Sequence, residues 1–138
     1  MSIECKDINF SMDLANEIKT KEFPLTIEMI YKNRYDATYR IKKAYRDNSK
    51  MPSAVVIYRD FYNEENAITK RRIYSFEVAV SERGRGIGHR MMKELMWDAE
   101  ELSLGYLQDA KQFYLKEGFC ESGENEMTWR SPDLEAIR

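Results

Sequence analysis

The stretch that most constrains the fold runs from Ser75 to Glu101. It opens with an apolar, β-branched run, continues through a glycine-rich turn, and passes directly into a segment whose apolar residues recur at helical spacing. Those apolar residues are Ile87, Met91, Met92, Leu95 and Met96. The pattern predicts a strand, a tight loop and a helix, with the helical apolar face buried.

The loop between that strand and helix has the composition of an anion site. Gly84, Gly86 and Gly88 alternate along it, which permits positive φ values and a close approach of a ligand to the backbone. The amides of the following helical turn face such a ligand at the positive end of the helix dipole. Three arginines add charge at the same corner: Arg83, Arg85 and Arg90. A phosphate or pyrophosphate suits this corner.

Three common glycine-loop families do not fit this spacing. A dinucleotide-binding fingerprint spaces its glycines G-x-G-x-x-G and usually opens a domain, whereas this loop lies past mid-chain. A P-loop ends in Gly-Lys-Ser/Thr, which is absent here. A kinase loop is followed by a strand with Val-Ala-Ile-Lys, and here a helix follows.

Two motifs in order resemble a known family. Arg83, Gly86 and Gly88 match the pattern Arg/Gln-x-x-Gly-x-Gly/Ala between a strand and a helix. Residues 110–119, Ala-Lys-Gln-Phe-Tyr-Leu-Lys-Glu-Gly-Phe, match Ala-x-x-Phe-Tyr-x-x-x-Gly-Phe at every fixed position. Together they resemble the GNAT N-acetyltransferases. The resemblance implies an α/β fold of mixed α+β type, in which helices flank a twisted, mixed, mostly antiparallel sheet that splays open between its fourth and fifth strands.

The length and composition indicate one globular domain, 1–138. The chain has 138 residues, of which 43% are hydrophobic and 33% charged. No apolar run approaches the roughly 20 residues of a membrane span, and the N-terminus has no signal-peptide core. We therefore expect a cytoplasmic protein with no membrane partner.

Charge and metal-ligand content exclude two further classes. The net charge is −2 with both signs interleaved, so no nucleic-acid partner is expected, and the basic run 70–72 is interpreted as a solvated strand. Two cysteines, Cys5 and Cys120, and one histidine form neither a disulfide framework nor a metal centre. No metal is expected.

Along the chain we predict a strand over 2–10, a short helix from Ser11 or Asp13 to about Lys19, and a helix opened by Pro24. That helix carries an amphipathic stripe of Leu25, Ile27, Ile30, Tyr31 and Arg34. Residues 35–45 fit both a helix and a strand, and we favour a strand from about Tyr39.

Strands at 53–58 and 68–80 follow, so that three successive antiparallel strands lead into the glycine loop. The helix after the loop is predicted to end near 102–105, with a short strand at 104–107. Asp109 is predicted to cap a helix that runs through Lys116 and that Gly118 ends. A hairpin of 119–122 and 127–130 completes the domain.

The resemblance implies a coenzyme site and a reaction. The co-substrate is acetyl-CoA, and the chain is an N-acyltransferase that acetylates a primary amine on a small molecule, a peptide or a protein. The family holds the acetyl carbonyl with an amide at the end of the fourth strand, which here is Val78 or Val80, because the register is ambiguous. The residues implied to contact the coenzyme diphosphate are Arg83, Gly84, Arg85, Gly86, Ile87, Gly88 and His89.

Two side chains are candidates for proton transfer. Tyr114 matches the family tyrosine that protonates the departing thiolate, and a phenol with a pKa near 10 suits that task. Phe113, its neighbour, is predicted to be the core residue of the pair. Glu77 lies on the strand before the loop, where relatives place a carboxylate that acts through water; an exposed structural role is equally open. His89 is not expected to be the base, because a helix N-terminus disfavours its protonated form.

Two departures from the family bear on activity. The stretch from Gly88 to Ala110 is shorter than usual, and position 107 is Leu where relatives often have a coenzyme-binding Asn. A catalytically inactive relative that binds acyl-CoA or a protein partner therefore stays open as the alternative function. A homodimer also stays open.

Overall fold

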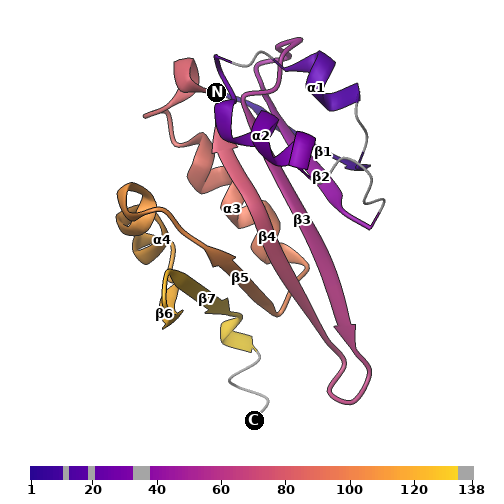
Figure 1. Ribbon diagram of the computed structural model, residues 1–138, viewed down its shortest axis with the longest axis vertical. Coiled ribbons are helices and arrows are strands. Elements are labelled where there is room, and N and C mark those ends of the chain that lie inside the picture. Colours follow the sequence, from indigo (N-terminus) through magenta and orange to yellow (C-terminus); the bar gives the residue numbers. More distant parts are fainter. Residues whose placement is uncertain (11–12, 19–20, 33–37, 134–138) are drawn as a thin grey trace. The chain divides into compact units, whose positions relative to one another are not determined.

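The structure is a computed structural model that describes residues 1–10, 13–18, 21–32 and 38–133. Its chain groups into two compact units (Figure 1). The first unit combines Met1–Arg59 with Tyr74–Met91, and the second combines Asp60–Ile73 with Met92–Arg138. Whether they act as the predicted single domain stays a prediction.

Within the described residues, seven strands form one sheet in the order β1-β2-β3-β4-β5-β7-β6. The strands are β1 (Ile3–Asn9), β2 (Arg40–Arg46), β3 (Ala54–Asn63), β4 (Ile68–Val78), β5 (Glu101–Gly105), β6 (Cys120–Gly123) and β7 (Glu126–Arg130). β4 and β5 are parallel, whereas the pairs β1–β2, β2–β3, β5–β7 and β6–β7 are antiparallel. The predicted fold class, a mixed, mostly antiparallel sheet with helices, is confirmed.

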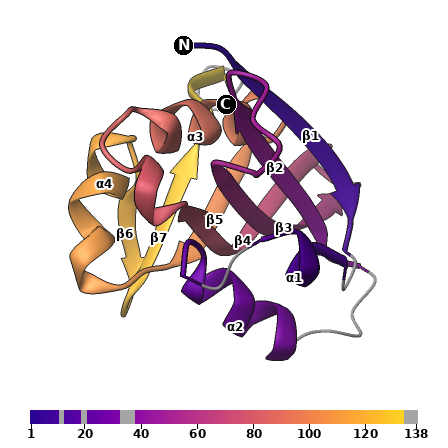
Figure 2. The ribbon, with the colours of Figure 1, turned by 90° about the horizontal axis from the view of Figure 1, so that it is seen from above.

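The first unit packs two helices, α1 (Asp13–Glu17) and α2 (Pro24–Lys32), on one face of its strands. Figure 2 shows both helices on the same side of β2 and β3. Ile41 of β2 pairs with Ile57 of β3, and both side chains join Leu14 and Ile30 in the buried cluster. The prediction of a strand after Tyr39 is therefore confirmed, since β2 runs from Arg40 to Arg46 and pairs with β3.

Helix α2 begins at Pro24 as predicted, but its buried face is rotated from the predicted stripe. Thr26 and Ile30 are fully buried, whereas Leu25 and Tyr31 are exposed. The cause is polar: the backbone amide and hydroxyl of Thr26 both donate to Glu77 on β4, which turns this face inward. The predicted stripe residue Arg34, like the helix-boundary residues Ser11 and Lys19, lies outside the described residues.

The segment after the glycine loop differs from its prediction. Helix α3 (Ile87–Trp97) ends well before 102, and β5 occupies 101–105 in place of the predicted 104–107. Glu100 stops the helix by exchanging two hydrogen bonds with Thr69 of β4, one through its amide and one through its carboxylate. Leu102 and Leu104 are then buried at the alternating positions of a strand.

In the second unit, the predicted cap of α4 (Lys111–Lys116) is wrong. Asp109 lies in a 3₁₀ turn, Gln108–Ala110, and the residue at the cap is Ala110, which makes no side-chain cap bond. Gly118, with φ of 99°, ends the helix as predicted. The predicted hairpin is confirmed as β6 and β7.

The basic run on β4 is not the solvated strand that we predicted. Arg71 is almost fully buried and bonds two carboxylates, Asp60 and Asp98, together with the carbonyl of Leu95. Arg72 pairs with Glu126 of β7. A buried guanidinium requires such partners, because an unpaired buried charge is very costly.

No helix in the described part of the chain is long and apolar enough to cross a membrane.

Candidate functional site

The end of β4 determines which of the two valines presents an amide. The Ala79 amide donates to the Ser53 carbonyl at 2.8 Å. Because successive amides of an extended chain point to opposite edges, the Val78 amide points away from Ser53. Val80 lies in a 3₁₀ turn, Val80–Glu82, and its amide donates to the Glu22 carbonyl at 3.2 Å. The amide of Val80 is therefore already used within the protein.

The glycine loop that follows has the predicted left-handed conformation at Gly84 and Gly86, whereas Gly88 lies inside α3 and is not among the residues with positive φ. Gly84 and Gly86 have φ of 81° and 82°, the left-handed region that favours glycine. A Cβ built at either position would meet no atom within 4 Å, so the loop is open above the backbone. The first helical hydrogen bond of α3 runs from the Arg90 amide to the Gly86 carbonyl at 3.1 Å. The amides of 87–89 precede that bond, at the positive end of the dipole.

The loop arginines contact the protein itself. Nε of Arg83 donates to the Val78 carbonyl at 3.2 Å, and Nη2 lies 3.8 Å from a carboxylate oxygen of Glu77. Nε of Arg85 lies 3.2 Å from the Glu82 carboxylate. Both side chains are about half exposed, so each is available to an incoming anion.

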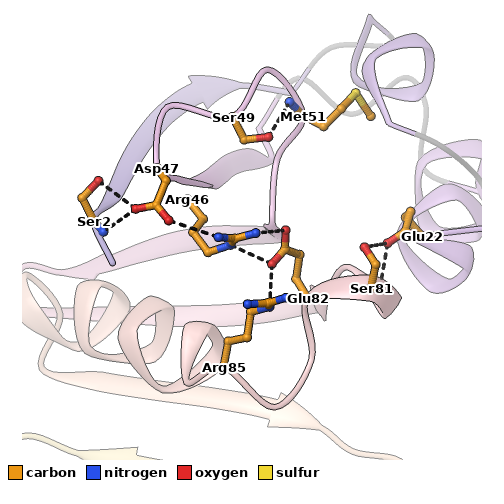
Figure 3. A network of polar contacts seen from close by, with 9 residues as sticks. All are labelled: Ser2, Glu22, Arg46, Asp47, Ser49, Met51, Ser81, Glu82 and Arg85. Atoms are coloured by element: carbon orange, nitrogen blue, oxygen red, sulfur yellow. Dashed lines mark hydrogen bonds and ion pairs between the residues drawn. The ribbon is translucent and has the colours of Figure 1, made fainter.

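Figure 3 shows the polar network around Glu82. Arg46 of β2 donates twice to that carboxylate, from Nε at 2.8 Å and from Nη2 at 3.1 Å. Its remaining nitrogen donates to Asp47 at 3.1 Å, and Asp47 accepts from the backbone amide of Ser2 at 2.8 Å. The hydrogen bond to Glu82 raises the pKa of the Arg46 guanidinium. No local sequence pattern indicates this network, because Arg46 and Glu82 lie 36 residues apart.

Glu77 is buried, not the exposed strand residue that sequence reasoning considered. Its Oε1 accepts from the Thr26 amide and the Thr26 hydroxyl, both at 2.8 Å, and its Oε2 accepts from the Leu25 amide at 3.2 Å. The carboxylate therefore caps the N-terminus of α2, where the helix dipole favours a negative charge.

A second connection joins the start of α2 to the end of β4. The Glu22 carboxylate accepts from the Ser81 amide at 3.0 Å and from the Ser81 hydroxyl at 2.7 Å (Figure 3). With the bond from Val80 to the Glu22 carbonyl, these contacts bind residues 22–26 to residues 77–81. The strand end that carries the Val78 amide is thus anchored to α2 in the first unit.

Tyr114 belongs to the second unit, on α4. It is 8% exposed and makes edge-to-face contacts with Phe113 and Phe119, with ring centroids 5.3 and 5.7 Å apart. Phe113 is only partly buried, so the prediction that it is the core residue of the pair is wrong. Burial raises the pKa of Tyr114 to about 12. Its phenol is therefore fully protonated at neutral pH, able to donate a proton but not to accept one.

The predicted site residues thus fall into two groups. Glu77, Val78, Val80 and the loop 83–89 lie together in the first unit, and Tyr114 lies in the second. Leu107, at the position where relatives often have Asn, is 59% exposed.

The fold is similar to solved structures of low sequence identity. One, described as a KacTA–DNA complex, superposes with a TM-score of 0.70 at 11% identity, covering 99% of this chain and 98% of the other. AtaTR bound with AcCoA has a TM-score of 0.66 at 12% identity, with 98% and 97% covered. A ribosomal-protein-alanine N-acetyltransferase from Brucella melitensis biovar Abortus 2308 has a TM-score of 0.63 at 14% identity, with 89% and 96% covered.

A search of curated protein sequences found no match. The family model for the acetyltransferase (GNAT) domain matches residues 41–121, which include β2, the glycine loop and Tyr114. Because that match spans more than half of the sequence, the chain belongs to the GNAT acetyltransferase family.

Proposed function

We propose that this protein transfers an acetyl group from acetyl-CoA to a primary amine. The observation that carries the proposal is the end of β4, where the strand leads through left-handed glycines into the N-terminus of α3. This arrangement offers a row of backbone donors to an anionic ligand. A solved relative is described with AcCoA bound, and another is named as an N-acetyltransferase, which supports the same chemistry here.

In this proposal the coenzyme diphosphate binds the backbone of 83–89. The open space above Gly84 and Gly86 leaves room for phosphate oxygens near the amides. Arg83 and Arg85 exchange their carboxylate partners for phosphate oxygens, since each makes only a single or long contact now. Metal is not required in this scheme, because charge on the diphosphate is met by the amides and guanidinium groups.

We propose Val78, and not Val80, as the amide that polarises the acetyl carbonyl. The Val80 amide is bonded to Glu22, whereas the Val78 amide points to the edge of β4 opposite Ser53. A preorganised amide stabilises the oxyanion as the amine nitrogen attacks the carbonyl carbon. Val80 then belongs to the connection with α2.

Proton transfer completes the step. As the new C–N bond forms and the C–S bond breaks, the sulfur leaves as a thiolate and takes the phenolic proton of Tyr114. The acetylated nitrogen gives up its extra proton, which we propose passes through water to Oε2 of Glu77. That oxygen accepts one hydrogen bond, at 3.2 Å, whereas Oε1 accepts two at 2.8 Å, so Oε2 has more acceptor capacity left. Solvent then restores the phenol.

We further propose that the two compact units act as one acetyltransferase domain, because β3, β4 and α3 each run from one unit into the other.

We propose no nucleic-acid role like the DNA complex of the KacTA relative. The net charge is −2, and Arg71 and Arg72 are paired with carboxylates. The cytoplasmic location stays a prediction.

Calorimetry with acetyl-CoA and a thiol-release assay over a panel of amines test the proposal together. We expect binding by the unmodified protein and thiol release with at least one amine. Binding without release for every amine offered would favour the alternative, an inactive relative that acts by binding. A protein that does not bind acetyl-CoA would contradict both.

A further inference from the structure

Glu82 lies between two guanidinium groups that hold it unequally (Figure 3). Arg46 makes a bidentate pair with it, at 2.8 and 3.1 Å, whereas Arg85 makes a single contact at 3.2 Å. The Arg46 side chain is 27% exposed and that of Arg85 is 51% exposed. Bidentate, better-buried pairs are the stronger ones, so Arg85 is the partner that leaves first.

The two arginines also lie on different structural elements. Arg85 belongs to the glycine loop and can turn toward a ligand there. Arg46 lies at the end of β2, where its contact with Asp47 holds it, and Asp47 in turn bonds Ser2. The guanidinium of Arg46 is therefore held where it compensates the negative charge of Glu82, whether or not Arg85 stays in contact with that carboxylate.

We propose that Arg46 is a positioning residue for coenzyme binding, which acts by neutralising Glu82 when Arg85 moves to the diphosphate. The inference rests on the proposed function, because it assumes that an anion binds at the loop. Without Arg46, the release of Arg85 would leave an uncompensated carboxylate beside two phosphates, and like charges at such a distance repel. Glu82 would then retain Arg85 and compete with the coenzyme for it.

The charge balance shows the size of this effect. Arg46, Glu82 and Arg85 together carry a net charge of +1, and removal of Arg46 reduces it to zero. The loss of a guanidinium hydrogen-bonded to this partly buried carboxylate changes affinity by about tenfold, which corresponds to about 1.4 kcal/mol. We therefore expect Arg46→Gln to weaken acetyl-CoA binding by about tenfold.

A double-mutant cycle measured by calorimetry with acetyl-CoA tests the mechanism. Glu82→Gln removes the competing carboxylate, so we expect it to bind as tightly as the unmodified protein or more tightly. In the double variant Arg46→Gln/Glu82→Gln, the affinity should recover to within about threefold of that of Glu82→Gln, because no carboxylate remains to be neutralised. Arg40→Gln, an exposed arginine at the other end of β2, should leave the affinity unchanged.

The outcomes are distinct. If Arg46 served only to hold the loop to β2, either single change would break that pair, and the double variant would not recover. A tenfold loss in Glu82→Gln alone would overturn the proposal even if Arg46→Gln failed to fold. Acetyl-CoA binding by the unmodified protein with an unchanged affinity in Arg46→Gln would overturn this inference while leaving the proposed function intact. An unmodified protein that binds no acetyl-CoA would overturn both.

Discussion

The loop after β4 and the helix α4 differ in their electrostatic environment: the loop carries paired charges, and α4 carries a buried neutral phenol. Around the loop, arginines that are about half exposed pair with better-buried carboxylates, as in the contacts of Arg83 with Glu77 and of Arg85 with Glu82. On α4, Tyr114 is buried against two phenylalanines, and burial alone raises its pKa. These environments fit the roles that we propose, because exposed arginines can bind an anion and a buried phenol stays protonated.

The two regions also differ in what holds their backbones. The strand end before the loop is held by contacts with a distant segment, in which Glu22 accepts from the Ser81 amide and Thr26 donates to Glu77. The end of α4 is held by its own chain: the Phe119 amide donates to the Tyr114 carbonyl at 3.1 Å, and Gly118 supplies the left-handed turn. Long-range contacts support the first region, and local turn chemistry supports the second.

The largest expected effect comes from the buried side chains of α3, a helix that runs from the first unit into the second. Met91 belongs to the first unit and Leu95 to the second, and both side chains are fully buried. Met91→Ala or Leu95→Ala should each lower the free energy of unfolding by about 2 to 5 kcal/mol, through lost burial and a cavity. Thermal and urea denaturation measure the change. Trp97→Ala on the same helix, where the side chain is 89% exposed, is the control and should have little effect. Unchanged melting temperatures in both alanine variants would refute the buried face.

The next effect separates charge from shape in the glycine loop. Gly86→Asp places a carboxylate where we propose that phosphates meet amides, and it should weaken acetyl-CoA binding by about 10²-fold or more. Gly86→Asn is the matched control, because Asn has the same shape, tolerates the left-handed φ comparably and carries no charge. We expect Asn to lose much less affinity than Asp by calorimetry. Equal losses would show that backbone strain, not charge, governs the site.

Tyr114→Phe tests the α4 side in the chemical step. The variant keeps the ring contacts with Phe113 and Phe119 and removes only the hydroxyl. We expect kcat to fall by roughly 10²-fold with little change in acetyl-CoA affinity, as for the loss of a general acid. The assay is steady-state thiol release with an amine found in the screen. Full kcat in the variant would mean that solvent or another residue protonates the thiolate.

A smaller effect is expected where Thr26 meets Glu77. Thr26→Val removes one hydrogen bond to a buried carboxylate and should lower the free energy of unfolding by about 1.5 to 3 kcal/mol. Thr26→Ser retains the hydroxyl and should lose clearly less. Denaturation curves of the two variants measure the difference. If Thr26→Val is as stable as the unmodified protein while Thr26→Ser is destabilised, the methyl packing matters and the hydroxyl bond does not.

The sequence predicted the elements whose signals are local. The strand, glycine loop and start of α3 follow from periodicity and glycine spacing, and the α4 motif located Tyr114 and Gly118. The end of α3 was missed because residues 98–101, Asp-Ala-Glu-Glu, contain no Gly or Pro to stop a helix, while the bonds that stop it come from Thr69, 31 residues away from Glu100.

The same distinction applies to the candidate site. Nothing local shows that Glu77 is buried, since its partners Leu25 and Thr26 are more than 50 residues earlier in the chain. The choice between Val78 and Val80 likewise depended on Glu22, a residue that carries no motif. Backbone conformation was readable from sequence, whereas the side-chain partners of the charged residues were not.

The smallest expected effect concerns the alkaline limit of stability. The pKa of Tyr114 is raised from 10.0 to about 12 in the folded protein, so folding favours the protonated phenol. The corresponding contribution to stability is fully present below pH 10 and is lost as pH rises through about 12. Tyr114→Phe cannot ionise at this position, so its stability should fall less steeply between pH 10 and 12. Between pH 8 and pH 11, the stability of the unmodified protein relative to Tyr114→Phe should fall by on the order of 1 kcal/mol.

Urea denaturation of both proteins at these two pH values measures this change. Lysines and arginines titrate in both proteins, so their contribution cancels. If the difference in free energy of unfolding between the two proteins does not change with pH, the phenol ionises as readily in the folded as in the unfolded chain. Burial of Tyr114 on α4 would then not raise its pKa.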